Sequence, residues 1–324
     1  MTPAWLTRSR PGLGLALGVG VVSTAALLVR WALDAGAQPL AIAAARLTLA
    51  ALLMWPLCWW STPVAPGARD RAGAKPARRL PPPRLLAWIF LAGCSLAVHF
   101  AAWISSLDHT SVASSVALVT TNPIWVALGA WLVFRDRPTA RLWAAIALSL
   151  AGSALISWSD LMPPTLDGDL PQTTPLADSG QEANPLLGNA LALLGAVAMS
   201  GYMLAGQAVK GLDDSIGFMR YVAAVYSVAA VLLILCAGIA GAAWWELPAA
   251  AWPALVLLAL GPQMLGHTLI NYALRHLAPT VVALAILGEP IGAALLAYFL
   301  LDEGIGIAQF LGFGLVVLAV VLAR

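Results

Sequence analysis

The chain has 324 residues, of which 61% are hydrophobic and 10% are charged, and its mean hydropathy is +0.86. This much apolar sequence exceeds what the core of a soluble domain needs, so the composition excludes an ordinary soluble fold and is typical of polytopic membrane proteins. The net charge is only +2, and no nucleic-acid partner is expected.

Apolar runs long enough to cross a bilayer as helices predict ten membrane spans. In chain order, these runs cover residues 12–33, 40–60, 85–107, 112–134, 142–158, 187–208, 216–243, 252–274, 280–301 and 305–323. Five runs precede one long polar loop and five follow it. We therefore expect an all-α integral membrane protein of ten transmembrane helices, with a five-helix repeat over residues 12–158, an acidic extracytoplasmic linker over 159–186 and a second five-helix repeat over 187–323.

The charges outside the runs are distributed unevenly. With ten spans, all the basic residues of the loops and ends fall on one side of the membrane: Arg8, Arg10, Arg69, Arg71, Lys75, Arg78, Arg79, Arg84, Arg135, Arg137, Arg141, Lys210, Arg275 and Arg324. The loop of residues 159–185, on the other side, has five acidic residues and no Lys or Arg. Basic loops favour the cytoplasm, so both termini are expected there. The high usage of Ala, Gly and Arg favours a bacterial source, and hence the cytoplasmic (inner) membrane.

The segment of residues 61–84 is rich in Pro, Ala and Arg and contains Pro81-Pro82-Pro83 near its end. Such a composition does not form a buried element. The segment has two interpretations: a simple determinant of topology, or a flexible cytoplasmic tether whose cations contact the anionic headgroups of membrane lipids.

Two pairs of a polar residue and a proline, Asn122-Pro123 and Glu289-Pro290, each lie about ten residues into an apolar run, near the expected bilayer midplane. A shift of 167 residues (289 minus 122) lays the first pair on the second, and also Ala127-Leu128 on Ala294-Leu295. We interpret the chain as an internal duplication. Because five is an odd number of spans, the second copy enters the membrane in the opposite orientation, and the two inverted repeats would share a cavity near mid-depth.

Polar side chains are costly in hydrocarbon, so those inside the runs are candidates for a solute or ion site. Glu289 is the sharpest candidate, with three interpretations. It could exchange a proton in each transport cycle, pair with a cationic group of the solute, or link neighbouring helices by hydrogen bonds. Asn122 holds the corresponding position of the first repeat and follows the hydroxyl pair Thr120-Thr121.

Two histidines, His99 and His267, lie at nearly corresponding positions of the third and eighth runs. A neutral imidazole offers one donor and one acceptor to a solute and could relay protons, or it could bond a neighbouring backbone carbonyl in a purely structural role. Trp103 and Asn271 are further candidates for the lining of the same cavity.

Arg46 lies about seven residues into the second run, roughly 10 Å from its outer end. It could hold a carboxylate of the solute, pair with Glu289 or Asp34, or snorkel so that its guanidinium reaches the headgroups. The sequence favours the last, structural role, because a single cation near the interface can reach the surface.

These motifs resemble the drug/metabolite transporter superfamily, EamA type. In the first half the resemblance rests on Val98-His99, Trp103, Leu107, Thr110-Ser111-Val112-Ala113 and Asn122-Pro123. In the second half it rests on Gly261-Pro262-Gln263, Gly266-His267-Thr268, Asn271, Ala278-Pro279-Thr280, Gly288-Glu289-Pro290 and Asp302-Glu303. Arg46 falls where the family often has an arginine, whereas Asp136 replaces the usual glutamate of the first repeat. The resemblance implies a ten-helix secondary carrier with inverted repeats that works by alternating access.

The expected function is export of a small metabolite, an amino acid or a related compound, with protons as a possible coupling ion. The alternatives are an importer or facilitator of a small solute and, from another class, an intramembrane lipid-modifying enzyme that uses His99, His267 and Glu289 as acid and base. The sequence lacks the phosphate-binding motif of a nucleotide-driven pump, and we expect no enzyme activity. Neither a metal nor a cofactor is expected, because the histidines and the three cysteines have no ligand spacing. The carrier is expected to be a monomer or a homodimer.

Overall fold

The structure is a computed structural model that describes residues 4–60, 81–135, 137–161, 184–210, 217–277, 279–301 and 305–322. Most of the basic segment 61–84 and most of the acidic linker 159–186 lie outside these described residues. The same holds for Asp136 and for Asp302-Glu303, so the part of the family resemblance that rests on them concerns the sequence alone.

All regular elements within the described ranges are helices. They are α1 (Ala4–Val22), α2 (Ala25–Asp34), α3 (Pro39–Trp60), α4 (Pro83–Ser106), α5 (Val112–Val119), α6 (Asn122–Phe134), α7 (Ala140–Leu161), α8 (Pro185–Lys210), α9 (Phe218–Ile239), η1 (Ala249–Ala251), α10 (Trp252–Leu258), η2 (Ala259–His267), α11 (Thr268–His276), α12 (Pro279–Ile286), α13 (Glu289–Leu301) and α14 (Ile307–Leu322). The all-α class predicted from the sequence is therefore confirmed.

Eight helical stretches of the described residues are long and apolar enough to cross a membrane. They cover Pro11–Asp34, Pro39–Cys58, Pro83–Ser106, Val112–Phe134, Pro185–Val209, Phe218–Ile239, Ala249–His276 and Pro279–Leu300. The apolar parts of α7 and α14 that the structure describes, Ala140–Ile156 and Ile307–Ala319, are shorter. The chain is thus a multi-pass membrane protein, as its composition predicts.

Four of these stretches are interrupted, and the interruptions follow from local chemistry. α5 ends and α6 begins at Thr120-Thr121, and α12 ends and α13 begins at Leu287-Gly288, in each case just before a polar residue and a proline. Proline has no N–H to continue the helical hydrogen bonds. At the first break the hydroxyls of Thr120 and Thr121 also donate to the carbonyls of Val116 and Leu118, both at 2.7 Å, beside the backbone N–H groups of the same two residues.

The stretch Ala249–His276 contains a π-helical segment, η2, which includes Pro262. This geometry leaves carbonyl groups without their usual partners, and the Tyr226 hydroxyl of α9 donates to the carbonyl of Gln263 at 3.1 Å. The fourth interruption, at Ser23-Thr24, separates α1 from α2, and the Ser23 hydroxyl donates to the Val19 carbonyl at 3.0 Å.

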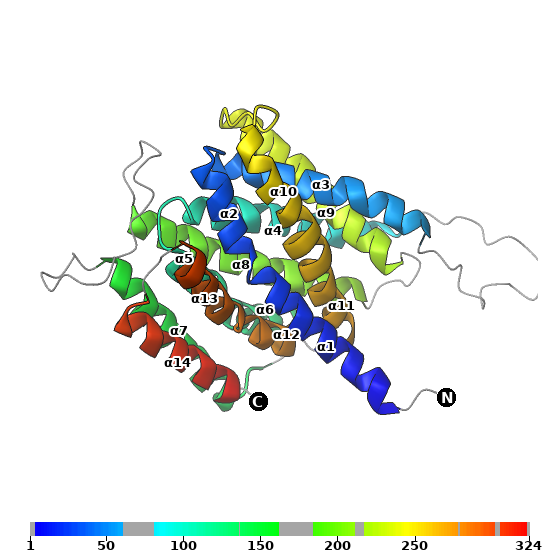
Figure 1. Ribbon diagram of the computed structural model, residues 1–324. Helices are drawn as coiled ribbons and strands as arrows, with labels where there is room; N and C mark the ends of the chain where they lie inside the picture. The colour runs from blue at the N-terminus through cyan, green and yellow to red at the C-terminus, as the bar shows by residue number, and fades with distance from the viewer. Residues whose placement is uncertain are drawn as a thin grey trace, which may run out of the picture.

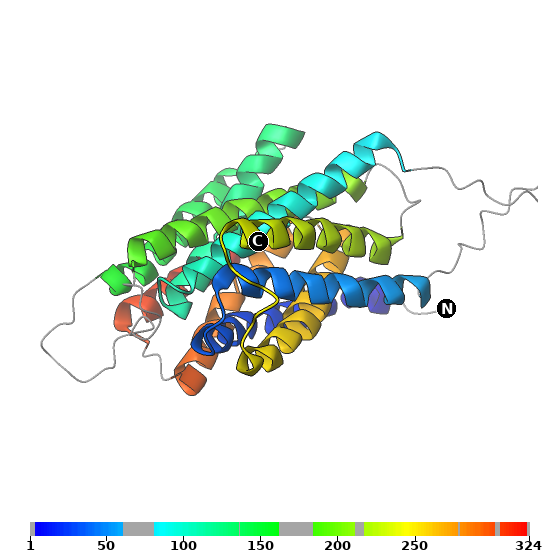
Figure 2. The ribbon, with the colours of Figure 1, turned by 90° about the horizontal axis from the view of Figure 1, so that it is seen from above.

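The helices α3, α9, α4 and α8 form a layer in that order, because α3 packs along α9, α9 along α4 and α4 along α8 (Figure 2). The interrupted helices cross one face of this layer, and α7 and α14 lie side by side at one edge of the molecule (Figure 1). The breaks at α1/α2, α5/α6 and α12/α13 and the π-helical η2 therefore come together inside the bundle. This arrangement places their polar side chains away from lipid.

Candidate functional site

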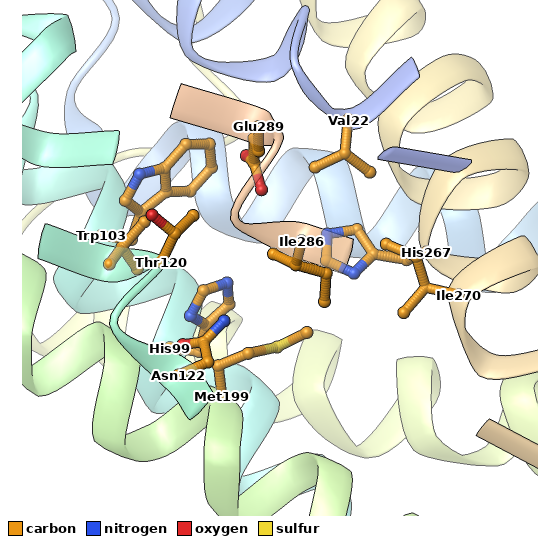
Figure 3. A pocket seen from close by; sticks show the side chains of 11 residues that line it. Val22, His99, Trp103, Thr120, Asn122, Met199, His267, Ile270, Ile286 and Glu289 are labelled. Atoms are coloured by element: carbon orange, nitrogen blue, oxygen red, sulfur yellow. The ribbon is translucent and has the colours of Figure 1, made fainter. Parts of the chain in front are cut away.

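The helix breaks surround a small internal cavity. Its wall consists of Val22, His99, Trp103, Val119, Thr120, Asn122, Met199, His267, Ile270, Ile286 and Glu289 (Figure 3). The space open to the centre of a water molecule is about 20 Å³, which is room for one or two ordered waters. A metabolite does not fit, and we call this conformation occluded for that reason. A larger site requires movement of the surrounding groups.

Glu289 begins α13 directly after the break at Leu287-Gly288, and its side chain is only 7% exposed. Figure 3 shows its carboxyl group directed into the space bordered by Trp103, His99 and His267. A carboxylate at the N-terminus of a helix is favoured by the helix dipole. The start of α13 therefore favours a carboxylate at this position, and its oxygens face the cavity.

The two histidines meet across the cavity, with ring centroids 6.5 Å apart. Nδ1 of His99 lies 2.9 Å from the carbonyl oxygen of Gly195, and since a carbonyl can only accept, Nδ1 donates and Nε2 of the neutral ring is an acceptor. Nδ1 of His267 has no hydrogen-bond partner among the residues that the structure describes. Within the described residues, no group of three or more His, Cys, Asp or Glu side chains is placed to hold a metal ion.

Trp103 and Asn122 each bring an unpaired polar atom to the wall. The Trp103 indole stacks on His99 with centroids 6.1 Å apart, and its Nε1–H donor has no partner. Asn122 begins α6, and its side-chain oxygen has no partner either. The wall therefore offers donors and acceptors that a bound polar molecule could satisfy, since buried polar groups are normally hydrogen-bonded.

Arg46 of α3 lies behind the wall. Its Cζ atom lies 4.1 Å from the centroid of the Phe100 ring and 5.9 Å from that of Trp103, and Phe100 in turn contacts His267. The side chain is 0% exposed, so the expectation that it snorkels to the surface is wrong. The position of a residue along a helix does not tell which face of that helix is buried. Arg46 faces the interior of the bundle, where its Nε donates to Oε1 of Gln263 at 2.9 Å.

Asn271 also lies outside the wall, on α11, and is 5% exposed. Its side chain lies beside the hydroxyls of Tyr202 and Tyr226, and its Nδ2 donor has no partner. Of the seven residues predicted for the site, the structure thus brings five to the cavity wall, His99, Trp103, Asn122, His267 and Glu289. Arg46 and Asn271 are buried nearby, and a role in binding stays a prediction for all seven.

The remaining wall residues were missed as site residues from the sequence. Thr120 could have been found from its position next to Asn122 and the break. The others are apolar, namely Val22, Val119, Met199, Ile270 and Ile286. An apolar residue in a membrane span has the same composition signal whether it faces lipid, the core or a cavity, so no sequence pattern distinguishes these five.

Comparison with known proteins finds a matching family and a solved structure with a similar fold. A model of the EamA-like transporter family matches residues 10–158 and 186–324. A solved structure, described only as "Crystal structure of protein", shares 17% sequence identity with this chain, with 98% of each chain covered and a TM-score of 0.67, which shows the same fold. No curated protein sequence matches the chain.

Proposed function

The chain belongs to the EamA-like transporter family, and from that premise we propose that it is a secondary carrier that exports a small metabolite, an amino acid or a related compound, by alternating access. The family consists of membrane transporters of small solutes and not of enzymes. The observation that carries the proposal is the occluded cavity with unpaired polar atoms where the Asn122-Pro123 and Glu289-Pro290 breaks meet.

The proposed architecture is ten spans in two inverted repeats, over residues 12–158 and 187–323, joined by the linker 159–186. Two observations support it: the family matches each half of the chain separately, and the α5/α6 and α12/α13 breaks occur at corresponding points of the two halves. Five spans in each half imply the inversion, and the basic loops imply cytoplasmic termini. The membrane would be the bacterial inner membrane, and the carrier a monomer or a homodimer.

The cavity would be the central part of the solute pathway. Trp103, Asn122 and His267 would contact the solute through their unpaired atoms, and His99 through its acceptor Nε2. Glu289 would exchange a proton with each cycle. Asn271 would act next to the cavity, among the tyrosine hydroxyls. Because rigid bundles joined at broken helices can rock around a fixed site, movement of the α5/α6 and α12/α13 ends would open the cavity to one side at a time.

The direct test is mass spectrometry of medium and cytosol from cells that express the wild-type chain, the Glu289→Gln variant or an empty vector. We expect at least one small molecule to leave wild-type cells faster than vector cells, and the variant to lose this difference. Faster depletion of a solute from the medium would indicate an importer instead. A change confined to membrane lipids would favour the intramembrane enzyme, and no change with a folded protein in the membrane would contradict export.

A further inference from the structure

The buried positive charge of Arg46 has no hydrogen-bonded counter-ion among the described residues. The guanidinium is fully buried, and within the described part of the chain only Nε of its three nitrogens has a hydrogen-bond partner, while Nη1 and Nη2 have none. Glu289 is the acidic residue of the nearby cavity wall, yet no hydrogen bond joins it to Arg46. A buried charge without a bonded counter-ion is unfavourable, so this group calls for an anion that the described residues do not supply.

The polar atoms around Arg46 are also donors without acceptors. Because a guanidinium only donates, Gln263 must turn its Oε1 toward Arg46, which leaves its Nε2 as a donor. This donor lies beside the Tyr226 hydroxyl but makes no hydrogen bond with the described residues. The indole N–H of Trp103, whose ring centroid lies 5.9 Å from the guanidinium carbon, likewise has no partner among the described residues. Arg46, Gln263 and Trp103 come from α3, η2 and α4, so three separate elements direct free donors to one region.

Two aromatic side chains contact this donor cluster. The Tyr226 hydroxyl donates to the backbone carbonyl of Gln263, which fixes the π-helical turn that carries the amide. The Phe100 ring covers the guanidinium at 4.1 Å, and the same ring contacts His267 in the cavity wall at 5.4 Å. The Phe100 ring therefore lies between the donor cluster and the cavity wall.

We propose that Arg46 and Gln263 form the binding site for a carboxylate group of the transported solute, with Phe100 as its cover in the occluded conformation. A planar carboxylate matches the two free nitrogens of a guanidinium, which bind it in a bidentate manner. The acceptors of the site, the Glu289 carboxyl and the Asn122 oxygen, lie in the cavity wall and suit the amino group of the solute. This inference rests on the proposed transport function and narrows it to amino acids and similar carboxylates.

The test uses the purified full chain in liposomes loaded with one of two mixtures. The first contains the twenty standard amino acids, and the second contains the same amino acids as their amides, in which the α-carboxylate is replaced by a neutral group. We expect members of the first mixture to leave the vesicles and their amides to stay. Equal efflux of both mixtures, or efflux of neither, would overturn the proposal. Export of another kind of solute from cells would still uphold the transport function.

Two variants connect this selectivity with the donor cluster. Arg46→Lys keeps the charge but loses the bidentate geometry, and we expect its half-saturating concentration for the transported amino acid to rise roughly 10- to 100-fold. Gln263→Leu, which removes one neutral donor, should raise it roughly 3- to 10-fold. A matched control is Arg30→Lys, because Arg30 is a buried arginine outside the cavity wall that donates to the Thr110 carbonyl.

Each variant is compared only if it melts near the wild-type temperature, and Gln263→Leu serves where Arg46→Lys does not fold. Wild-type half-saturation in the folded variants would show that Arg46 is a structural cation beneath Phe100 and would overturn the proposed site. Loss of affinity that is equal for Arg30→Lys and Arg46→Lys would do the same, since a general effect of burying lysine would then explain both.

Discussion

Replacing Glu289 with glutamine is expected to abolish the response of export to a transmembrane proton gradient. Glu289 is a buried carboxyl group that faces an internal cavity, and glutamine has nearly its shape but cannot release a proton. With one proton exchanged per solute, the wild-type protein should build a steady-state solute gradient of about tenfold per pH unit across the vesicle membrane. The variant should reach equal solute concentrations on both sides at every pH gradient, as measured with a labelled solute in liposomes.

Two further variants decide what the loss means. Glu289→Asp retains a carboxyl group on a side chain one methylene shorter, so it should keep the gradient response at a reduced rate. Glu246→Gln removes an exposed carboxylate outside the cavity and should behave as wild type. A Glu289→Gln protein that still follows the pH gradient would show that Glu289 acts as a link between helices, the structural role that the sequence leaves open.

The structural features that could be predicted are those whose sequence pattern allows few structural interpretations. A proline preceded by a polar residue in the middle of an apolar run interrupts helical hydrogen bonding, and both pairs, at Asn122 and Glu289, occur at observed helix breaks. The corresponding positions of His99 and His267 likewise predict a shared cavity, and the two rings meet there. These residues are polar within apolar runs, so their corresponding positions in the two halves indicate where the site lies.

The features that could not be predicted depend on which face of a helix is buried. The distance of Arg46 from the helix end allows snorkelling and so favours the surface, yet the direction of its side chain is set by α9, α4 and η2, which pack against α3. The π-helical register of η2 has no sequence signature beyond Gly261-Pro262, although it decides that Gln263 meets Arg46. The direction of the Arg46 side chain thus depends on packing against α9, α4 and η2, which are far from α3 or from one another in the sequence.

The edge of the bundle depends on a contact between two glycines. A Cβ atom built on Gly152 of α7 would lie 2.7 Å from the carbonyl oxygen of Gly312 in α14, and one on Gly312 would lie 2.6 Å from the carbonyl oxygen of Gly152. Side-chain atoms cannot occupy such positions, so the two backbones touch only because both residues are glycine. α7 is in turn joined to α5, where the Ser153 hydroxyl donates to the Ala117 carbonyl at 3.3 Å.

Replacing Gly312 with valine is therefore expected to destabilise the protein by about 1–3 kcal/mol or more, because the added atoms force the α7 and α14 backbones apart. The measurement is the melting temperature of the purified protein in detergent, followed by intrinsic tryptophan fluorescence. Gly314→Val is the matched control: it places the same side chain on the same helix, and a Cβ atom at Gly314 meets nothing within 4 Å. Both variants carry any cost of valine in a helix, so the difference between their melting temperatures reports the glycine contact alone. Equal melting temperatures would show that α14 can move away from α7 without loss of stability.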